Sequence, residues 1–474
     1  MKENLKRPGF YGAILSFCSI ATLIGLLIRL DAIPLRFIAL VALIALVALI
    51  ALLLFGVACR LFFKRPHTIW KNVFAWMIIT PLTIAMLGGS WYVAKTNELL
   101  WSLSMKERTY ISEVCVYVPQ NSAIQSLQEL QGKRIGYYET DEDQTSVEML
   151  KQFKKEGVSI ESSAYPSLTP LLDALKAKKV EAIIAQRPLI EALTQEDGLQ
   201  ENQPLRAIAT KKVKVELDRG RSATLDVTKT PFTVLIMGTN EYGSVNENSA
   251  NTVNILAVVN PQDKKKLLVS LPKETYVWNN KLGYLGIQGT HVVRQALEQE
   301  LDVPIDYTVR VNLTTMTGIV DQLGGIEIDN KQAFETKSKQ KFEQGKLWLD
   351  AKQALTYVQE CPNDPSNPNQ GEMVVLSAMI EKILSSKALA HFETIQSVLG
   401  ESIQTSMSKE QIGDLVKMQM LQRAPWTLEI VSVEGRLEEK DIEPLGEKAN
   451  VLVLDDQTLQ RVEQKIDAVL RAGS

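Results

Sequence analysis

The sequence predicts an α/β protein with N-terminal membrane helices, a small α/β accessory domain and a larger α/β domain with a mixed central sheet. Three long apolar runs occupy the first 100 residues, and strand-like segments alternate with helix-like segments through most of the remainder. The 474 residues also exceed one ordinary domain. We therefore expect a membrane region at 1–100, an accessory domain at 110–210, a linker at 211–230 and the larger domain at 231–474.

The three apolar runs cover residues 10–30, 37–59 and 70–94, and each is long enough for the roughly 20 residues that span a bilayer. A cleaved signal peptide would have one shorter apolar run, so it fits the sequence poorly. The second run is apolar on every face, which a helix in a soluble domain seldom is. The sequence thus predicts three membrane-spanning helices.

The basic residues predict the orientation of these helices. They precede the first run and lie between the second and third, as at Arg60 and Lys64, so the positive-inside rule places the N-terminus in the cytoplasm. Three spans then place everything after Ala94 outside the plasma membrane. Cys115 and Cys361 fall in this exported part, where a disulfide is chemically possible, and the sequence leaves their pairing open.

Composition excludes several function classes. Residues 1–100 carry ten Lys and Arg against three Asp and Glu, whereas the rest of the chain carries 42 against 52. This acidic remainder opposes a nucleic-acid surface, so no nucleic-acid partner is expected. Four cysteines exclude a disulfide scaffold, and three histidines make His-based metal or triad chemistry a poor expectation.

The accessory domain is expected to contain a mostly parallel sheet, because its strand and helix patterns alternate. The predicted strands are 114–118, 134–138 and 180–185, and the predicted helices are 124–130, 147–153 and 171–175. Two of its segments, LQELQGKRIGYY and LLDALKAKKVEAIIAQ, resemble fragments of one lobe of solute-binding proteins. The polar, charged stretch after it has the composition of a linker.

The larger domain shows the same alternation with longer apolar strands, which predicts a mixed sheet. Its predicted strands are 232–238, 253–259, 266–271, 306–311, 426–433 and 451–454. Its predicted helices are 291–300, 314–323, 351–358 and 373–384.

Five segments of this domain resemble the LytR-CpsA-Psr (LCP) family of cell-envelope proteins. They are FTVLIMGTNEYG, VNILAVVNPQDKKKLLVSLPKETYV, IDYTVRVNL, DQLGGIEI and LDAKQALTYV, and they occur in order over residues 232–358. Three membrane spans followed by a small domain also resemble the capsule-locus members of the family. The resemblance implies a Gram-positive bacterium and a role in cell-wall or capsule polysaccharide assembly.

The family resemblance implies a phosphotransferase that moves a glycopolymer from a polyprenyl-pyrophosphate carrier onto peptidoglycan. Aspartates would hold Mg²⁺, arginines would bind the pyrophosphate, and an apolar pocket would hold the lipid. The implied partners are the lipid bilayer, the polyprenyl-linked glycan, and active paralogues or capsule-assembly proteins.

This sequence departs from the family pattern at most of those positions. The two metal positions match Asn240 and Thr252. The catalytic and pyrophosphate positions match Ala250, Lys273, Gln359, Cys361, Gln370 and Glu372. The cationic candidates that remain for pyrophosphate are Lys273, Lys281 and Arg310.

These substitutions weaken metal and pyrophosphate binding, because Mg²⁺ is usually held by carboxylates and phosphates, and because Lys273 keeps the charge but lacks the planar fork of arginine. They favour a noncatalytic or weakly active homologue that binds the lipid-linked glycan and regulates or assists polymer attachment. An active phosphotransferase is the alternative, so the sequence leaves open whether the protein is an enzyme. Mg²⁺ binding is doubtful on the same grounds.

Overall fold

The structure is a computed structural model that describes residues 8–30, 33–44, 46–47, 50, 68–103, 109–138, 145–196, 204–216, 225–239, 250–312, 318–321, 323–362, 370–383, 403–421, 426–443 and 446–471. The chain forms two compact units. One contains the described residues among 1–104 and 408–424, and the other contains those among 105–383, 403–407 and 426–474.

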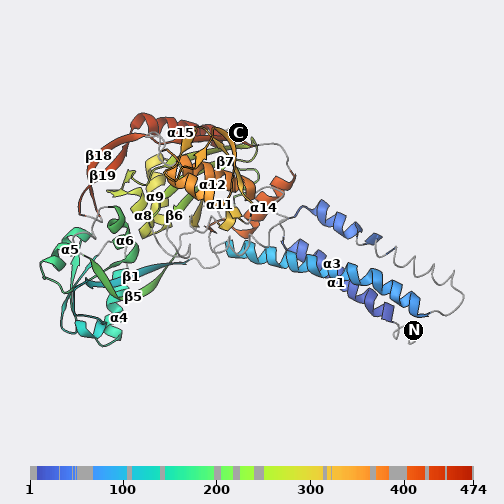
Figure 1. Ribbon diagram of the computed structural model, residues 1–474, viewed down its shortest axis with the longest axis horizontal. Helices are drawn as coiled ribbons and strands as arrows, with labels where there is room; N and C mark the ends of the chain where they lie inside the picture. Colours follow the sequence, from blue (N-terminus) through green and yellow to red (C-terminus); the bar gives the residue numbers. More distant parts are fainter. Residues whose placement is uncertain are drawn as a thin grey trace. The chain divides into compact units, whose positions relative to one another are not determined.

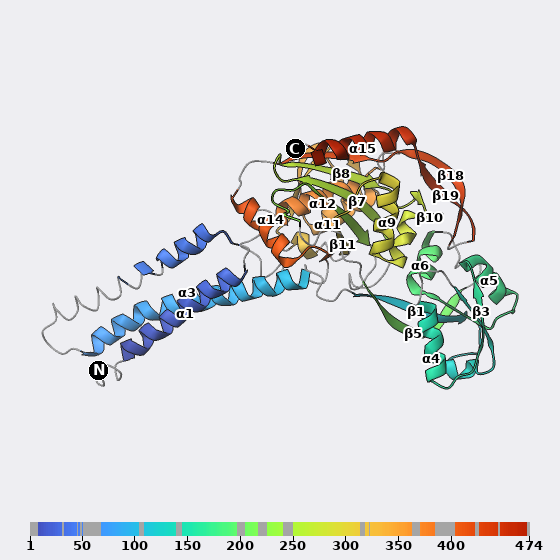
Figure 2. The same cartoon turned by 180° about the vertical axis from the view of Figure 1, so that it is seen from behind.

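The first unit is helical. Its helices are α1 (Pro8–Leu30), α3 (Thr68–Leu103) and α14 (Lys409–Leu421). Helices α1 and α3 lie side by side and run in the same direction (Figures 1 and 2). Their contact includes a buried hydrogen bond of 2.8 Å between the hydroxyls of Ser16 and Thr83, and Leu23 packs close to Gly89.

Helices α1 and α3 cover the first and third predicted spans. The start of the second predicted span is also helical, over 37–44, whereas 51–59 lie outside the described residues. Within the part of the chain that the structure describes, no helix is both long enough and apolar enough to cross a membrane. The three membrane spans therefore stay a prediction.

The second unit begins with the accessory domain, a five-stranded sheet in the order β3-β2-β4-β1-β5. Its strands are β1 (Thr109–Pro119), β2 (Arg134–Tyr138), β3 (Glu161–Tyr165), β4 (Ala182–Gln186) and β5 (Leu205–Glu216). Its helices are α4 (Thr145–Lys155), α5 (Leu168–Lys176) and α6 (Arg187–Glu196), with a 3-10 turn, η2 (Leu127–Leu130).

Three predictions for this domain need correction. The sheet is mixed rather than mostly parallel, because β1 pairs antiparallel with both β4 and β5. The predicted helix 124–130 is only a 3-10 turn over its second half. The predicted linker 211–230 begins inside β5, which ends at Glu216. Strand β5 is an edge strand whose lysines alternate with Val213 and Val215, and charged edge strands resemble linkers in composition.

The larger domain contains a six-stranded mixed sheet in the order β16-β11-β6-β7-β8-β17. These strands are β6 (Phe232–Thr239), β7 (Val253–Asn260), β8 (Lys265–Leu271), β11 (Tyr307–Asn312), β16 (Ile403–Thr405) and β17 (Thr427–Ser432). Two-stranded pairs surround it: β9 (Tyr276–Val277) with β10 (Asn280–Lys281), β12 (Ile326–Asn330) with β15 (Gly345–Leu349), β13 (Phe334–Glu335) with β14 (Lys341–Phe342), and β18 (Gly435–Ile442) with β19 (Glu447–Leu454).

The helices of this domain are α8 (Leu282–Gln288), α9 (Thr290–Leu301), α11 (Ala351–Glu360), α12 (Gln370–Ile383) and α15 (Asp456–Arg471). Helices α8, α9 and α15 pack on one face of the sheet, where Val293, Leu297 and Ile466 join Leu235 and Leu256 in one buried core. Helix α11 begins at a capping box, in which Asp350 and Gln353 exchange side-chain and backbone hydrogen bonds.

The predicted strands of the larger domain are confirmed, with one difference in pairing. The segment 451–454 belongs to the β18–β19 hairpin rather than to the central sheet, and α15 follows it. Of the predicted helix 314–323, the structure describes a helical turn at 318–321. Helices α9, α11 and α12 match their predictions to within a few residues.

The two domains of the second unit share a hydrophobic core. Leu168 and Leu171 of the accessory domain cluster with Tyr284 of α8 and with Ile442 and Val451 of the β18–β19 hairpin. The accessory domain therefore packs against α8, the helix that follows the β9–β10 hairpin.

Candidate functional site

The candidate site lies at one edge of the six-stranded sheet. Strands β6, β8 and β11 run in the same direction, so they end at the same edge, and the antiparallel strand β7 begins there. This arrangement brings Thr252, which precedes β7, to the end of β6, where its amide and its hydroxyl both donate to the Gly238 carbonyl. Lys273 follows the end of β8 at the same edge.

Several substituted family positions line one small pocket at this edge. Its lining consists of Ala250, Asn251, Thr252, Lys273, Glu274, Lys281, Gly283 and Tyr284. The free volume is about 20 Å³, which accommodates roughly one water molecule. The sequence therefore identified four positions that the fold brings together, namely Ala250, Thr252, Lys273 and Lys281.

Backbone hydrogen bonds hold this pocket closed. The amide of Gly283 donates to the Lys273 carbonyl at 2.9 Å, and the amide of Asn251 donates to the Gly283 carbonyl at 2.9 Å. A Cβ on Gly283 would lie 2.8 Å from the Asn251 carbonyl oxygen, so only glycine permits this approach. A single residue, Gly283, thus ties the loops before β7 and after β8 to the start of α8.

The two lysine charges in the pocket are largely balanced by neighbouring groups of the protein. The Lys273 ammonium lies 3.9 Å from the Glu274 carboxylate, and both side chains are partly exposed. The Lys281 ammonium, in a residue only 8% exposed, lies 5.2 Å from the centre of the Tyr284 ring. Both cations therefore have interactions inside the protein, which leaves less positive potential for an external anion.

A second carboxyl group, Glu372, lies near this pair. Burial, followed by the adjacent Glu274 carboxylate, raises the pKa of Glu372 to about 7, while Lys273 opposes the rise. Burial also raises the pKa of the Cys361 thiol, and the Glu372 charge adds to that effect. Since a thiolate is the nucleophilic form, Cys361 is not activated for nucleophilic chemistry.

The remaining predicted residues lie elsewhere or outside the description. Arg310 is 1% exposed in β11, level with Met237 across the sheet, and it does not line the pocket. Gln359 and Gln370 are placed only by their positions at the end of α11 and the start of α12. Asn240 lies outside the described residues. Cys115 and Cys361 are both free thiols, so the disulfide left open by the sequence is not formed.

The described donors do not fit a magnesium ion. Thr252 offers a hydroxyl, not a carboxylate, and that hydroxyl donates to the Gly238 carbonyl. Among the residues with described positions, no group of three or more His, Cys, Asp or Glu side chains is arranged to hold a metal. Asn251 and Tyr284 also line the pocket, although the sequence analysis gave them no role there. The only hint in the sequence was that each lies next to residues of the family motifs.

Comparison with known proteins identifies the family. Residues 199–467, more than half of the chain, match the LytR_cpsA_psr family, so the chain belongs to the LytR-CpsA-Psr family. Residues 109–222, which include the accessory domain, are similar to the NMT1/THI5-like family.

Two relatives carry explicit functional names. The chain is 28% identical over 253 residues to the polyisoprenyl-teichoic acid–peptidoglycan teichoic acid transferase TagU of Enterococcus faecalis, covering 50% of this chain and 79% of the relative. It is 27% identical over 282 residues to the corresponding transferase TagT of Bacillus subtilis, covering 54% and 84%. A crystal structure of B. subtilis TagU aligns with 52% of this chain and 99% of its own, at 23% identity and a TM-score of 0.41.

Proposed function

We propose that this protein is a membrane-anchored, extracellular member of the family that binds a polyprenyl-pyrophosphate-linked glycan with little or no transferase activity. One observation carries the proposal. At the sheet edge where the family pattern requires aspartates and arginines, the pocket is lined by Ala250, Thr252, Lys273 and Glu274. The protein would regulate or assist polymer attachment in cell-wall or capsule assembly, beside active paralogues or capsule-assembly proteins.

Charge counting supports the loss of activity. Lys273 is paired with Glu274, and Glu372 adds a second carboxyl group beside them. Each lost charge-assisted contact to a pyrophosphate is worth about 1.5–3 kcal/mol, so three or four would cost on the order of 5–10 kcal/mol if they were additive. Even the lower figure corresponds to a rate loss of about 10³-fold or more, although groups that act as a unit do not add.

On the face of the sheet opposite the α8, α9 and α15 core, the edge strand β17 exposes two apolar side chains that suit a lipid tail. The strand register places Ile430 in one row with Leu268, Ala257 and Val234, and these last three are buried, so the exposed apolar area is confined to β17. Ile430 is 39% exposed, and Leu428, two residues earlier in β17, is 37% exposed. Large apolar side chains left open on a sheet face favour contact with an apolar ligand.

The membrane anchor is supported by the apolar surface of the helical unit. Phe17 and Ile28 of α1 and Met77 and Ile84 of α3 are each more than half exposed to water in the isolated chain. Helices α1 and α3 run in the same direction, as the first and third spans of a three-span anchor would.

Reporter fusions test this topology. A reporter fused after Lys95 should be active only outside the cell, and one fused near Lys64 only inside, because the basic residues flank the cytoplasmic side. The opposite pattern would contradict the extracellular assignment.

The transferase assay compares the unmodified protein, an active family member and a restored variant, using a polyprenyl-pyrophosphate oligosaccharide and peptidoglycan. The restored variant carries Asn240→Asp, Ala250→Arg, Thr252→Asp, Lys273→Arg, Gln359→Arg and Cys361→Arg. We expect the unmodified protein to be at least about 10³-fold slower than the active member. Lipid binding and thermal melting are measured on each variant, because new arginines in a closed pocket strain the fold.

The alternative is an active phosphotransferase, which the names of the two relatives favour. Equal rates for the unmodified protein and the active family member would establish that alternative. Magnesium binding no tighter than about millimolar without a pyrophosphate ligand is expected from the donor set, since Mg²⁺ gives up its water reluctantly.

A further inference from the structure

A second concave site lies at the C-terminal end of α9, separate from the pocket described above. It is a hollow of about 540 Å³, within the range of about 300–1,000 Å³ typical of small-molecule sites. Gln295, Glu298 and Gln299 of α9 form one side, and Val303 and Pro304 lie in the turn that leads into β11. Trp278, from the tip of the β9–β10 hairpin, completes the lining.

The Trp278 ring is held in place at the rim of this hollow. Trp278 and Asn279 form the two-residue turn between β9 and β10, with φ of 52° and 55°. Both values are those that a two-residue hairpin turn requires, so the turn sets the direction of the Trp278 ring. The indole N–H donates to the Gln299 Oε1 atom at 3.0 Å, which fixes the ring while the residue stays 38% exposed.

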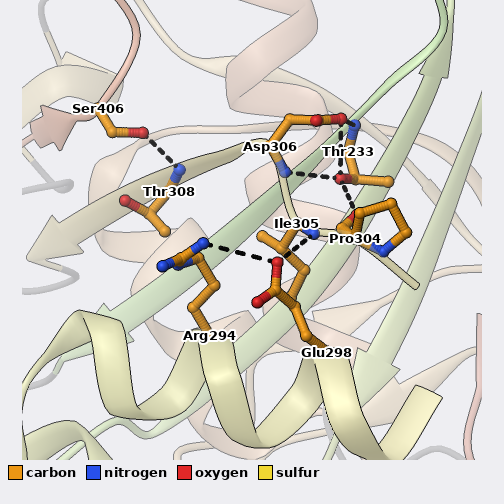
Figure 3. Close-up of polar contacts among 8 residues, drawn as sticks. All are labelled: Thr233, Arg294, Glu298, Pro304, Ile305, Asp306, Thr308 and Ser406. Carbon is orange, nitrogen blue, oxygen red and sulfur yellow. Dashed lines mark hydrogen bonds and ion pairs between the residues drawn. The ribbon is translucent and has the colours of Figure 1, made fainter. Parts of the chain in front are cut away.

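The opposite wall is also rigid. The Glu298 Oε1 atom accepts a hydrogen bond of 2.9 Å from the Ile305 amide and lies 3.6 Å from the Arg294 guanidinium, as Figure 3 shows. Arg294 is itself buried against the sheet. Among the described contacts the second Glu298 oxygen has no partner, so it is available to accept a hydrogen bond from a ligand.

The remaining polar groups suit hydroxyl-bearing ligands. Gln295, Asp302 and Gln299 line the hollow. Among the described residues, the side chains of Gln295 and Asp302 and the amide nitrogen of Gln299 make no hydrogen bond, and they supply both donors and acceptors. The lining contains the carboxylates of Glu298 and Asp302 and no lysine or arginine, so it disfavours phosphates and other anions.

We propose that this hollow is a carbohydrate site that takes one uncharged pyranose ring of a glycan chain. The ring's C–H face would stack on Trp278, and its hydroxyl groups would bond to Gln295, Gln299, Glu298 and Asp302. A pyranose presents an apolar face and a polar rim, which matches an exposed aromatic plane surrounded by amides and carboxylates. The site goes beyond the proposed function, because it needs neither a lipid nor a pyrophosphate.

The test measures oligosaccharide binding to the full-length protein in detergent by titration calorimetry and saturation-transfer NMR. The probes are chitotetraose, cellotetraose and maltotetraose, with glucose 6-phosphate as the charged comparison. Trp278→Asn removes the ring while keeping a residue that accepts positive φ, so the turn persists. Trp348→Ala is the matched control, because Trp348 is 54% exposed and lies outside the hollow.

We expect at least one neutral oligosaccharide to bind the unmodified protein and the Trp348→Ala variant equally. Trp278→Asn should weaken that binding by about tenfold or more, and Gln299→Ala should weaken it as well. Glucose 6-phosphate should bind more weakly than any neutral sugar that binds. Because the probes carry no pyrophosphate, this result is independent of the transferase assay.

Three results would overturn the carbohydrate site: no binding of any neutral probe, equal binding by Trp278→Asn, or tighter binding of glucose 6-phosphate. Self-association that depends on Trp278, measured by sedimentation, would also overturn it by assigning the hollow to a protein contact.

Discussion

The raised pKa of Glu372 gives a pH-dependent stability that a single substitution should remove. Burial and the neighbouring Glu274 carboxylate raise the pKa of Glu372 from 4.5 to about 7 in the folded protein. Below pH 4.5 the Glu372 carboxyl group is protonated in both the folded and the unfolded state, so it does not change the free energy of unfolding as the pH varies. Between pH 4.5 and 7 the folded state keeps a proton that the unfolded state releases, so this group lowers stability as the pH rises. Above pH 7 the loss is complete.

The size of the effect follows from the shift. One pKa unit corresponds to about 1.36 kcal/mol, so the full loss is at most about 3 kcal/mol. Glu372→Gln keeps the uncharged, hydrogen-bonding form at every pH. We therefore expect the variant to match the parent near pH 4.5 and to be more stable by up to about 3 kcal/mol at pH 8.

Thermal melting of the full-length protein in detergent, from pH 4.5 to 8, measures this difference. Glu161→Gln, an exposed glutamate in β3, is the control and should leave the pH dependence unchanged. Lys273→Met should steepen the dependence, because Lys273 lowers the pKa of Glu372. Parallel curves for Glu372→Gln and the parent protein would refute the assignment of a raised pKa to this carboxyl group.

Three further substitutions test the packing around the site. Tyr357→Phe removes the 2.9 Å hydrogen bond to Asn330 in a buried position and should cost about 1–3 kcal/mol of stability in a denaturant titration. Asp350→Ala removes the capping box of α11 and should cost about 0.5–2 kcal/mol in the same assay. Gly286→Ala would place a Cβ 2.5 Å from the Asn251 side chain, and overpacking of this kind costs about 1–3 kcal/mol, so the melting temperature should fall.

Two of these substitutions, Gly286→Ala and Tyr357→Phe, have a matched comparison. Gly88→Ala also adds a methyl group to a helical glycine, but nothing lies within 4 Å of its position, so it should be neutral or slightly stabilising. Equal melting temperatures for Gly286→Ala and Gly88→Ala would contradict the close packing of α8. Thr356→Val removes a hydroxyl that bonds only to the Lys352 carbonyl within α11. If Thr356→Val and Tyr357→Phe lowered the free energy of unfolding equally, the buried tyrosine would have no special role.

Much of the fold is readable in the sequence because buried strands have a local signature. The run over β6 contains four consecutive apolar residues, 234–237, since both faces of that strand are covered, and all eight of its residues are buried. Helix α11 is equally local, because its capping box and its apolar spacing lie within a few turns. Strand β5 was not predicted, because its lysines give it the composition of a linker. Only its pairing with β1 in the folded protein identifies it as an edge strand.

The sequence by itself determined the family, the order of the main strands, and four positions that meet in one pocket, because each depends on short motifs. Only the tertiary structure decided what those positions can do. The pKa of Glu372 depends on burial and on Glu274, nearly one hundred residues away, and the hollow beside Trp278 exists because a hairpin tip meets the end of α9. Burial and electrostatic coupling arise between segments distant in the chain, so no local pattern of residues encodes them.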